Sequence, residues 1–387
     1  MNKQTPYTYP SYYEYNRVHL IRGGAAYFEA LEDLIRQAQH YLYLQVYILE
    51  ADETGNRIRK ALEKAAARGV YVHVLVDGYA SQNLPLAFIQ SLVLAGVQFR
   101  FFEPLYRSRY FYFGRRLHHK VVVADGRRAL VGGLNISDRY NDTAQHPAWL
   151  DWAVLAEGEV AMGLHNICAA RALSAWRIHP SKLPKPPAFP LPETKVMVGI
   201  RVNDWVRRKS EITNCYLKMI ARADKEILIM SSYFFPGRKI RRQLVKAAHR
   251  GVRIRIVVAG HSDVKLAKQA ERYMYRWMLK NRMEVYEYQR NVLHAKVAVC
   301  DCHRVTIGSY NLNEISERAS VELNLEIADE NFARQVHHRM EEIISRDCER
   351  IITYRIFRWW ERMLQQAAYR LIRFLLVMFT FYFRQRE

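Results

Sequence analysis

The hydrophobic and polar positions in the first half of the chain recur in the second half. Residues 64–78 have the sequence KAAARGVYVHVLVDG, residues 246–260 have KAAHRGVRIRIVVAG, and eight of the fifteen positions are identical. Each segment predicts the end of a helix, an Arg-Gly stop and then a buried apolar strand. Gly69 and Gly251 suit a helix C-terminus that requires a positive φ. The chain therefore contains an internal duplication.

A second apolar run lies upstream of each repeat, HYLYLQVYIL at 40–49 and KEILIMSSYFF at 225–235. Each half thus predicts helix, strand, helix and strand, the pattern of a layered α/β domain. Residues 179–193 hold six of the twelve prolines, which neither a helix interior nor a central strand accommodates. We therefore predict a two-domain α/β protein, with domains at 1–180 and 194–350, a proline-rich linker at 181–193 and a separate tail at 351–387.

The tail is aromatic and rich in arginine, and its apolar residues recur at spacings of three and four, as on one face of a helix. Its uninterrupted apolar stretch, Phe374 to Phe383, is ten residues long. As a helix this measures about 15 Å, half the thickness of a bilayer core. We predict an amphipathic segment that associates with a membrane surface; the alternative is a helix that packs on the two domains. Residues 106–116, YRSRYFYFGRR, show a similar mixture of aromatic and basic residues. We predict that this segment contacts lipid headgroups; the alternative is an ordinary solvated loop.

The formal net charge of +21 indicates an anionic partner, either nucleic acid or an anionic membrane. The five cysteines form no CxxC pair, which favours a reducing compartment. The N-terminus has no apolar core of a signal peptide, and no apolar run reaches about 18 residues. We therefore expect a cytosolic catalytic part without a transmembrane helix.

A polar signature occurs once in each half, and its members keep the same spacing in both copies. It consists of a His-x-Lys pair, an aspartate, a glycine and an asparagine: His118, Lys120, Asp125, Gly132 and Asn135, then His294, Lys296, Asp301, Gly308 and Asn311. Histidine and lysine two positions apart on a strand project from the same face. The glycines let the backbone pass close to a ligand, so each asparagine can approach its histidine. Two such sets, brought together by pseudo-twofold symmetry, predict one shared site.

This set suits a phosphodiester. One imidazole can attack phosphorus while the other protonates the leaving alkoxide and then deprotonates the incoming nucleophile. Lysines and asparagines can stabilise the charge on the phosphoryl oxygens. The sequence shows no carboxylate cluster for a two-metal site, and Cys300 and Cys302 lack further ligands, so we expect neither metal nor cofactor.

Two carboxylates follow the motifs, Asp151 after the first and Glu322 after the second, and Asp151 lies farther along the chain from its motif histidine than Glu322 does. We predict that each forms a hydrogen bond with a histidine and orients it. Asp125 and Asp301 have two interpretations. They are included among the catalytic candidates, although shaping the turn after each strand is the role favoured for them.

These residues resemble the HKD motif of the phospholipase D superfamily, HxKxxxxD followed by GSxN or GGxN. The stretches LVDGYAS, AGVQFRFFEP, LVGGLNIS, YFFPG and EYQRNVLHAKVAV are similar to the bacterial cardiolipin synthase B subgroup. The resemblance implies two fused α/β/α sandwich domains that share one active site. It also implies a phosphohistidine on His118, with His294 as the general acid. Gly133 replaces the serine that the second motif has at Ser309, so one phosphate contact is expected to be absent. His119 should face away from the site.

The function implied by the resemblance is cardiolipin synthesis from two molecules of phosphatidylglycerol, with release of glycerol. The expected location is peripheral, on the cytoplasmic face of a bacterial inner membrane. Phospholipid hydrolysis or exchange to another alcohol is a close alternative, because the sequence indicates the phosphoryl site but not the acceptor. A nuclease is less favoured because of the aromatic, arginine-rich tail, and the two intact motifs argue against a non-catalytic membrane protein.

Overall fold

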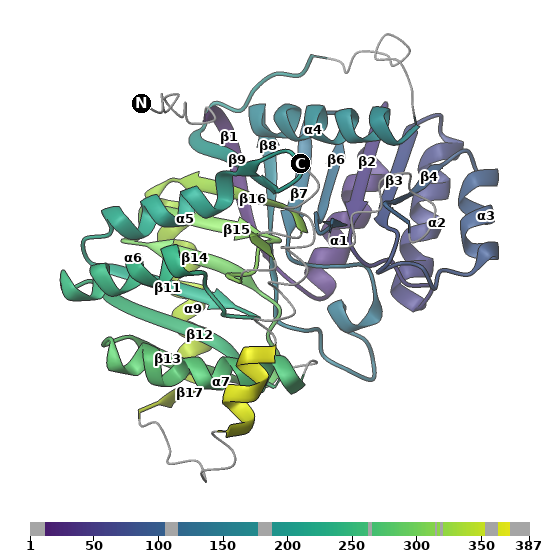
Figure 1. Cartoon of the computed structure of the whole chain (residues 1–387). Coiled ribbons are helices and arrows are strands. Elements are labelled where there is room, and N and C mark those ends of the chain that lie inside the picture. The colour runs from purple at the N-terminus through teal and green to yellow at the C-terminus, as the bar shows by residue number, and fades with distance from the viewer. Residues whose placement is uncertain are drawn as a thin grey trace, which may run out of the picture.

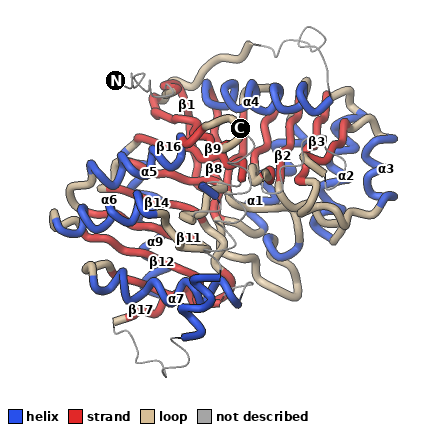
Figure 2. Tube along the Cα trace, viewed as in Figure 1, coloured by secondary structure: helices blue, strands red, loops and turns tan. Residues whose placement is uncertain are grey.

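Each half of the chain forms a mixed β-sheet with helices on both faces, and the two halves lie side by side (Figure 1). The computed structural model describes residues 12–104, 115–176, 188–261, 265–313, 316–317, 320–352 and 363–371. Strands form the inner layers and helices the outer ones, as the colours of Figure 2 show. The predicted α/β class and the likeness of the two halves are confirmed.

In the first half, three parallel strands continue into four antiparallel ones. Their order across the sheet is β4 (Gln98–Phe102), β3 (Tyr71–Asp77), β2 (Tyr41–Val46), β6 (Val121–Ala124), β7 (Arg128–Gly132), β8 (Trp152–Gly158) and β1 (Tyr13–Arg22).

The second half repeats this order with one additional edge strand. Its strands are β17 (Cys348–Ile351), β13 (Glu284–Val292), β12 (Arg253–His261), β11 (Glu226–Ser231), β14 (Lys296–Cys300), β15 (Arg304–Gly308), β16 (Ser320–Ala328) and β9 (Lys195–Asp204). The short β10 (Lys209–Ser210) extends β9 as a hairpin. Strands β1 and β9 pair with each other, so the two sheets are hydrogen-bonded together.

The helices take equivalent positions in both halves. The first half has α1 (Ala25–Gln37), α2 (Glu53–Ala67) and α3 (Leu86–Leu94) on one face and α4 (Glu159–Trp176) on the other. The second half has α5 (Glu211–Arg222), α6 (Arg238–His249) and α7 (Lys265–Lys280) on one face and α9 (Glu330–Asp347) on the other. Side chains of β2 alternate accordingly: Leu42 and Leu44 face α1 and α2, whereas Tyr41 and Tyr43 face α4.

The core between α4 and α9 belongs to both halves. Its buried residues come from the inner faces of the two sheets and from both of these helices. The outer cores, under α1 to α3 and under α5 to α7, each belong to one half. Because apolar burial contributes about 25 cal/mol per Å², the central core holds the two halves in a fixed relation.

The repeated Arg-Gly dipeptide has a structural reason in both halves. The guanidinium of Arg68 donates to carbonyl groups at the end of α1, with 3.1 Å to Ile35 O, and Arg250 does the same at the end of α5. Cations at this end of a helix satisfy carbonyls that lack intrahelical partners. Gly69 and Gly251 have φ of 89° and 92°, as the sequence predicted.

The linker and the tail lie partly outside the described residues, as does most of the 106–116 segment. Ile351, predicted to begin the tail, belongs to β17. Residues 363–371 are helical, with Ala368 buried and the Tyr369 ring 5.0 Å from that of Tyr273 on α7. Exposed on this helix are Met363, Leu364 and Leu371. Membrane association of the tail stays a prediction. In the part of the chain that the structure describes, no helix is long and apolar enough to cross a bilayer.

Candidate active site

Each motif histidine is held in place by the opposite half of the chain. The strand β5 (Arg116–Leu117) pairs with the start of β16, and His118 N–H donates to Val321 O at 2.9 Å. In the same way Leu293 pairs with Leu150 across the two halves, and His294 N–H donates to Leu150 O at 2.8 Å. The two motifs therefore meet at the boundary between the sheets, in a pseudo-symmetric arrangement.

The two carboxylates bind the histidines in a crossed pattern. Nδ1 of His118 lies 2.8 Å from Oε2 of Glu322, and Nδ1 of His294 lies 2.6 Å from Oδ2 of Asp151. Both carboxylates are fully buried. A carboxylate that accepts Nδ1–H leaves Nε2 as the nitrogen for chemistry. Each histidine takes its carboxylate partner from the other half. The number of residues between histidine and carboxylate within one half, which differs between the two halves, therefore has no bearing on the pairing.

The serine and the glycine after the motifs both serve these carboxylates. The hydroxyl of Ser309 donates to Glu322 and accepts the N–H of Leu323 at 3.0 Å. At the equivalent Gly133, a Cβ would lie 2.4 Å from both carboxylate oxygens of Asp151. Ser309 thus positions Glu322, and its predicted phosphate contact stays a prediction. Glycine in the first motif makes room for the shorter aspartate.

Gly132 and Gly308 allow neighbouring strands to approach each other closely. A Cβ on Gly132 would lie 2.6 Å from Trp152 O, and one on Gly308 would lie 2.4 Å from Leu323 O. Both contacts are with the backbone of the neighbouring strand. Close strand packing therefore requires glycine at both positions, and their place among the substrate-binding residues stays a prediction.

The two lysines lie beside the histidines and are buried. Nζ of Lys120 donates to His118 O at 2.9 Å and lies over the Tyr47 ring, and Nζ of Lys296 is 3.0 Å from Nδ1 of His294 and 3.3 Å from Ser232 Oγ. Burial lowers the pKa of Lys120 to about 7, although Glu322 opposes this shift. A nearby negative charge favours the protonated amine, so an anion bound in the site would raise this pKa again.

The asparagines differ between the halves. Asn135 accepts the N–H of Ile48 at 3.1 Å and donates to the Tyr140 hydroxyl at 2.8 Å. Asn311 accepts the Ser232 hydroxyl at 2.7 Å. Its amide nitrogen has no hydrogen-bond partner among the residues that the structure describes, so it is available to a phosphoryl oxygen.

Asp125 and Asp301 lie away from the histidines, at the far ends of β6 and β14. Each carboxylate accepts three backbone N–H groups, those of residues 39–41 for Asp125 and of residues 224–226 for Asp301. Four strand residues separate Lys120 from Asp125, about 16 Å along a strand. We therefore correct their predicted catalytic role: they fix the start of β2 and of β11, the turn-shaping role that the sequence favoured.

Three aromatic residues of the site were not predicted from the sequence. The ring of Tyr47 meets that of His118 edge-on at 4.8 Å, and Tyr140 and Trp149 surround His294 with centroids at 5.0 and 6.1 Å. Tyr47 directly follows β2, a buried strand that recurs in the second half. Its position at the end of this strand was the signal in the sequence that could have identified it as a residue of the site. His119 faces away, as predicted, and its Nδ1 is 3.2 Å from Gln45.

One group of side chains elsewhere has spacing suitable for a metal ion. Ligand atoms of Glu226, His337 and Glu341 lie within 4.8 Å of one another. The guanidinium of Arg255 is 2.7 Å from Glu226 and also bonds Glu341. These carboxylates are therefore already paired with a cation from the chain.

The chain matches the family model described as "Cardiolipin synthase, PLD-like domain" over residues 31–148 and 216–344, one match in each half. The chain therefore belongs to this cardiolipin synthase family of PLD-like proteins. Cardiolipin synthase B of Escherichia coli (strain K12) is 34% identical over 94% of this chain and 89% of its own length. Cardiolipin synthase A of Pseudomonas fluorescens is 31% identical over 84% of this chain and 68% of its own length.

Among solved structures, a phosphatidylserine synthase from Haemophilus influenzae has a TM-score of 0.75 with 16% identity. It covers 96% of this chain and 97% of its own chain. At that identity the likeness concerns the fold alone, which the two chains share over nearly their whole lengths; the PLD-like character of each half comes from the family model.

Introduction of a side chain at Gly133 should disable this family member. In Gly133→Ser the new side chain would displace Asp151, and His294 would lose its partner. We expect turnover of a soluble phosphodiester to fall about 10²–10⁴-fold without loss of the folded state, measured by steady-state kinetics and thermal unfolding. The reciprocal Ser309→Gly leaves the Glu322–His118 contact possible and should cost less. Unchanged turnover in Gly133→Ser would contradict the crossed pairing.

Loss of the Asp125 carboxylate should affect stability more than chemistry. Asp125→Ala leaves three backbone N–H groups without their acceptor, which we expect to lower the free energy of unfolding by about 3 kcal/mol. Urea unfolding measures this, and kinetics at low temperature should give a nearly unchanged kcat for the folded fraction. Unaltered stability together with a large fall in kcat would restore a catalytic role for Asp125.

Binding of an anion should weaken as the pH rises through about 7. Lys120 loses its proton in this range in the free protein, so an anion must bind together with a proton, and its affinity should fall up to about tenfold per pH unit above the pKa. The inhibition constant of sulfate between pH 6 and 9 measures this, since sulfate does not titrate there. Lys120→Arg, which stays charged, should remove most of the dependence. An equal slope in that variant would assign the titration to another group.

Proposed function

We propose that this protein is a cardiolipin synthase that transfers a phosphatidyl group from one phosphatidylglycerol to another through a covalent phosphohistidine. The observation that carries the proposal is the crossed pairing of two histidines with two buried carboxylates at the boundary of the halves. This arrangement supplies a nucleophile and an acid–base group in one place. Family membership supports a phospholipid as the substrate.

The proposed reaction has two displacements at phosphorus. Nε2 of His118 attacks, the bond from phosphorus to the glycerol oxygen breaks, and His294 gives its proton to that oxygen. Glycerol leaves, and His294 then accepts the proton of a hydroxyl on a second phosphatidylglycerol. That oxygen attacks phosphorus, the P–N bond breaks, and His118 is regenerated as cardiolipin departs.

Two features support this division of roles. Burial and the neighbouring Lys120 lower the pKa of His118, although Glu322 opposes the shift, and a neutral imidazole is the form that attacks phosphorus. Nε2 of His294 lies 3.5 Å from the Tyr140 hydroxyl, which also accepts a hydrogen bond from Asn135. A hydroxyl that can donate or accept suits a histidine that gains and loses a proton in each cycle.

The lysines and Asn311 would stabilise charge on the phosphoryl oxygens. Both ammonium groups lie within 3.3 Å of polar atoms of the site, and Lys296 reaches Ser232, the partner of Asn311. These donors come from the chain itself, so the mechanism requires no metal or cofactor. We further propose that the protein acts from the cytoplasmic face of the membrane, as a peripheral protein. The net charge of +21 supports attraction to phosphatidylglycerol-rich surfaces.

Purified protein with phosphatidylglycerol vesicles should give cardiolipin and glycerol, identified by mass. His118→Ala and His294→Ala should each reduce turnover by several orders of magnitude, and His118→Ala should abolish an acid-labile phosphoryl-enzyme adduct. The matched control is His119→Gln, which changes the neighbouring imidazole on the opposite face of the strand.

The products separate the alternatives. Formation of phosphatidic acid would show that the protein hydrolyses phospholipids instead of making cardiolipin. Transfer only to an added alcohol would show that it catalyses headgroup exchange. Cleavage of labelled single-stranded DNA without lipid turnover would refute the proposal. An adduct that persists in His118→Ala and disappears in His294→Ala would reverse the two roles.

A further inference from the structure

The helix α6 begins with basic residues where helix physics favours acidic ones. Its first five residues include Arg238, Lys239, Arg241 and Arg242, with no acidic residue in the first turn and no side-chain cap on Gly237. The N-terminus of a helix carries a partial positive charge, so cations there oppose the macrodipole. This part of the sequence therefore costs stability rather than adding to it.

The duplicated half provides an internal comparison. Helix α2 connects β2 to β3 as α6 connects β11 to β12, and it begins with Asp52 and Glu53. Asp52 accepts the N–H groups of Gly55 at 2.8 Å and of Asp138 at 2.7 Å, which is a favourable cap. The fold thus accommodates an acidic, capped start at this position, and the basic start of α6 is not a requirement of the architecture.

Three of the four basic side chains are exposed and unpaired. Arg238, Lys239 and Arg242 make no hydrogen bond or ion pair with any residue that the structure describes. By contrast, Arg253 and Arg255, on the strand that follows α6, each contact glutamates. These side chains oppose the dipole of their own helix and have no partner within the described chain. They are therefore available to bind an external anion.

These cations lie at the same edge of the sheet as the active site. Ser232, which contacts Lys296 and Asn311, follows β11, and only five residues separate it from Arg238. The next helix, α7, starts at the same edge after β12, and Leu266 in its first turn is 41% exposed. In Figure 1, α6 and α7 lie on the same, outer face of the second half.

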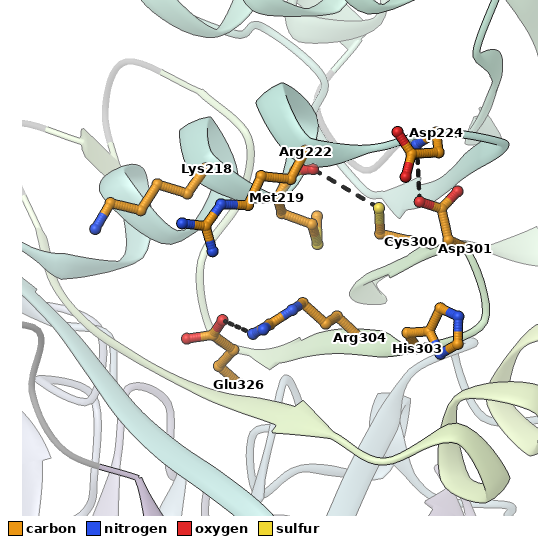
Figure 3. Close-up of a pocket in the computed structure, with 9 residues that line it drawn as sticks. All are labelled: Lys218, Met219, Arg222, Asp224, Cys300, Asp301, His303, Arg304 and Glu326. Atoms are coloured by element: carbon orange, nitrogen blue, oxygen red, sulfur yellow. Dashed lines mark hydrogen bonds and ion pairs between the residues drawn. The ribbon is translucent and has the colours of Figure 1, made fainter.

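A basic pocket at the opposite end of the second half differs from the start of α6 because its charged groups have partners within the chain. It is a cavity of about 180 Å³ beside the turn that contains Asp301. Figure 3 shows that Arg304 is paired with Glu326 in this pocket and that Asp301 is bonded to the backbone of Asp224. The charged groups of this pocket are therefore largely engaged in contacts within the chain.

We propose that Arg238, Lys239 and Arg242 form a docking surface for an anionic lipid bilayer, which presents the active-site edge of the second half to the membrane. The inference rests on the proposed function, because a lipid substrate requires the site to face the bilayer. Basic side chains near an anionic surface each add to binding and are screened by salt. Leu266, exposed in the first turn of α7, offers an apolar side chain at the same edge of the sheet.

The test is a triple variant, Arg238→Gln with Lys239→Gln and Arg242→Gln, in the full chain. Co-sedimentation with vesicles of phosphatidylglycerol and phosphatidylcholine at low salt should show affinity about 100-fold lower than in the parent. The matched control is Arg57→Gln with Lys60→Gln and Lys64→Gln on α2, which removes the same charge from exposed positions of the equivalent helix. The control should bind nearly as the parent does.

Two further readouts separate a docking role from damage to the fold. The triple variant should keep its turnover of a soluble short-chain phosphodiester. Its unfolding temperature should be equal to or above that of the parent, because the removed charges opposed the helix macrodipole.

Equal vesicle binding by the triple variant and the parent would overturn the proposal, as would an equal loss in the α2 control. Loss of single-stranded DNA binding with unchanged vesicle binding would assign the surface to nucleic acid instead. If the parent makes no cardiolipin but the triple variant still loses vesicle binding, the proposed function fails while the docking surface stands.

Discussion

The arrangement of the site depends on two carboxylates that are buried at the boundary between the halves. A buried carboxylate costs several kcal/mol unless it has a partner, and here the partner of each is a histidine of the opposite half. The site can therefore form only when both halves are held in one relation. The shared core between α4 and α9 and the pairing of β1 with β9 provide that constraint.

The duplication made a nearly symmetric site, and a few substitutions separate the two sides. In one half glycine at position 133 accommodates a short aspartate, and in the other Ser309 supports a longer glutamate. After the equivalent strands, Tyr47 contacts His118 whereas Ser232 contacts Lys296. These differences give the two imidazoles different surroundings, and two chemically distinct roles require such a difference.

Several motif residues contact the backbone of neighbouring strands. Asp125 and Asp301 each bind three N–H groups at the start of a neighbouring strand. Gly132 and Gly308 allow adjacent strands to approach. A motif can thus combine residues that face substrate with residues that hold the strand in position, and sequence spacing alone does not distinguish them.

The sequence by itself determined the duplication, the α/β class, the positions of both His-x-Lys pairs and the outward direction of His119. These follow from local periodicity, since alternation along a strand fixes which side chains share a face. It also identified Asp151 and Glu322 as partners of histidines. Only the tertiary structure decided that the partners cross between the halves, because strand pairing such as that of Leu150 with Leu293 joins segments far apart in the chain. The aromatic residues around the histidines were decided in the same way, by packing between elements that no local pattern relates.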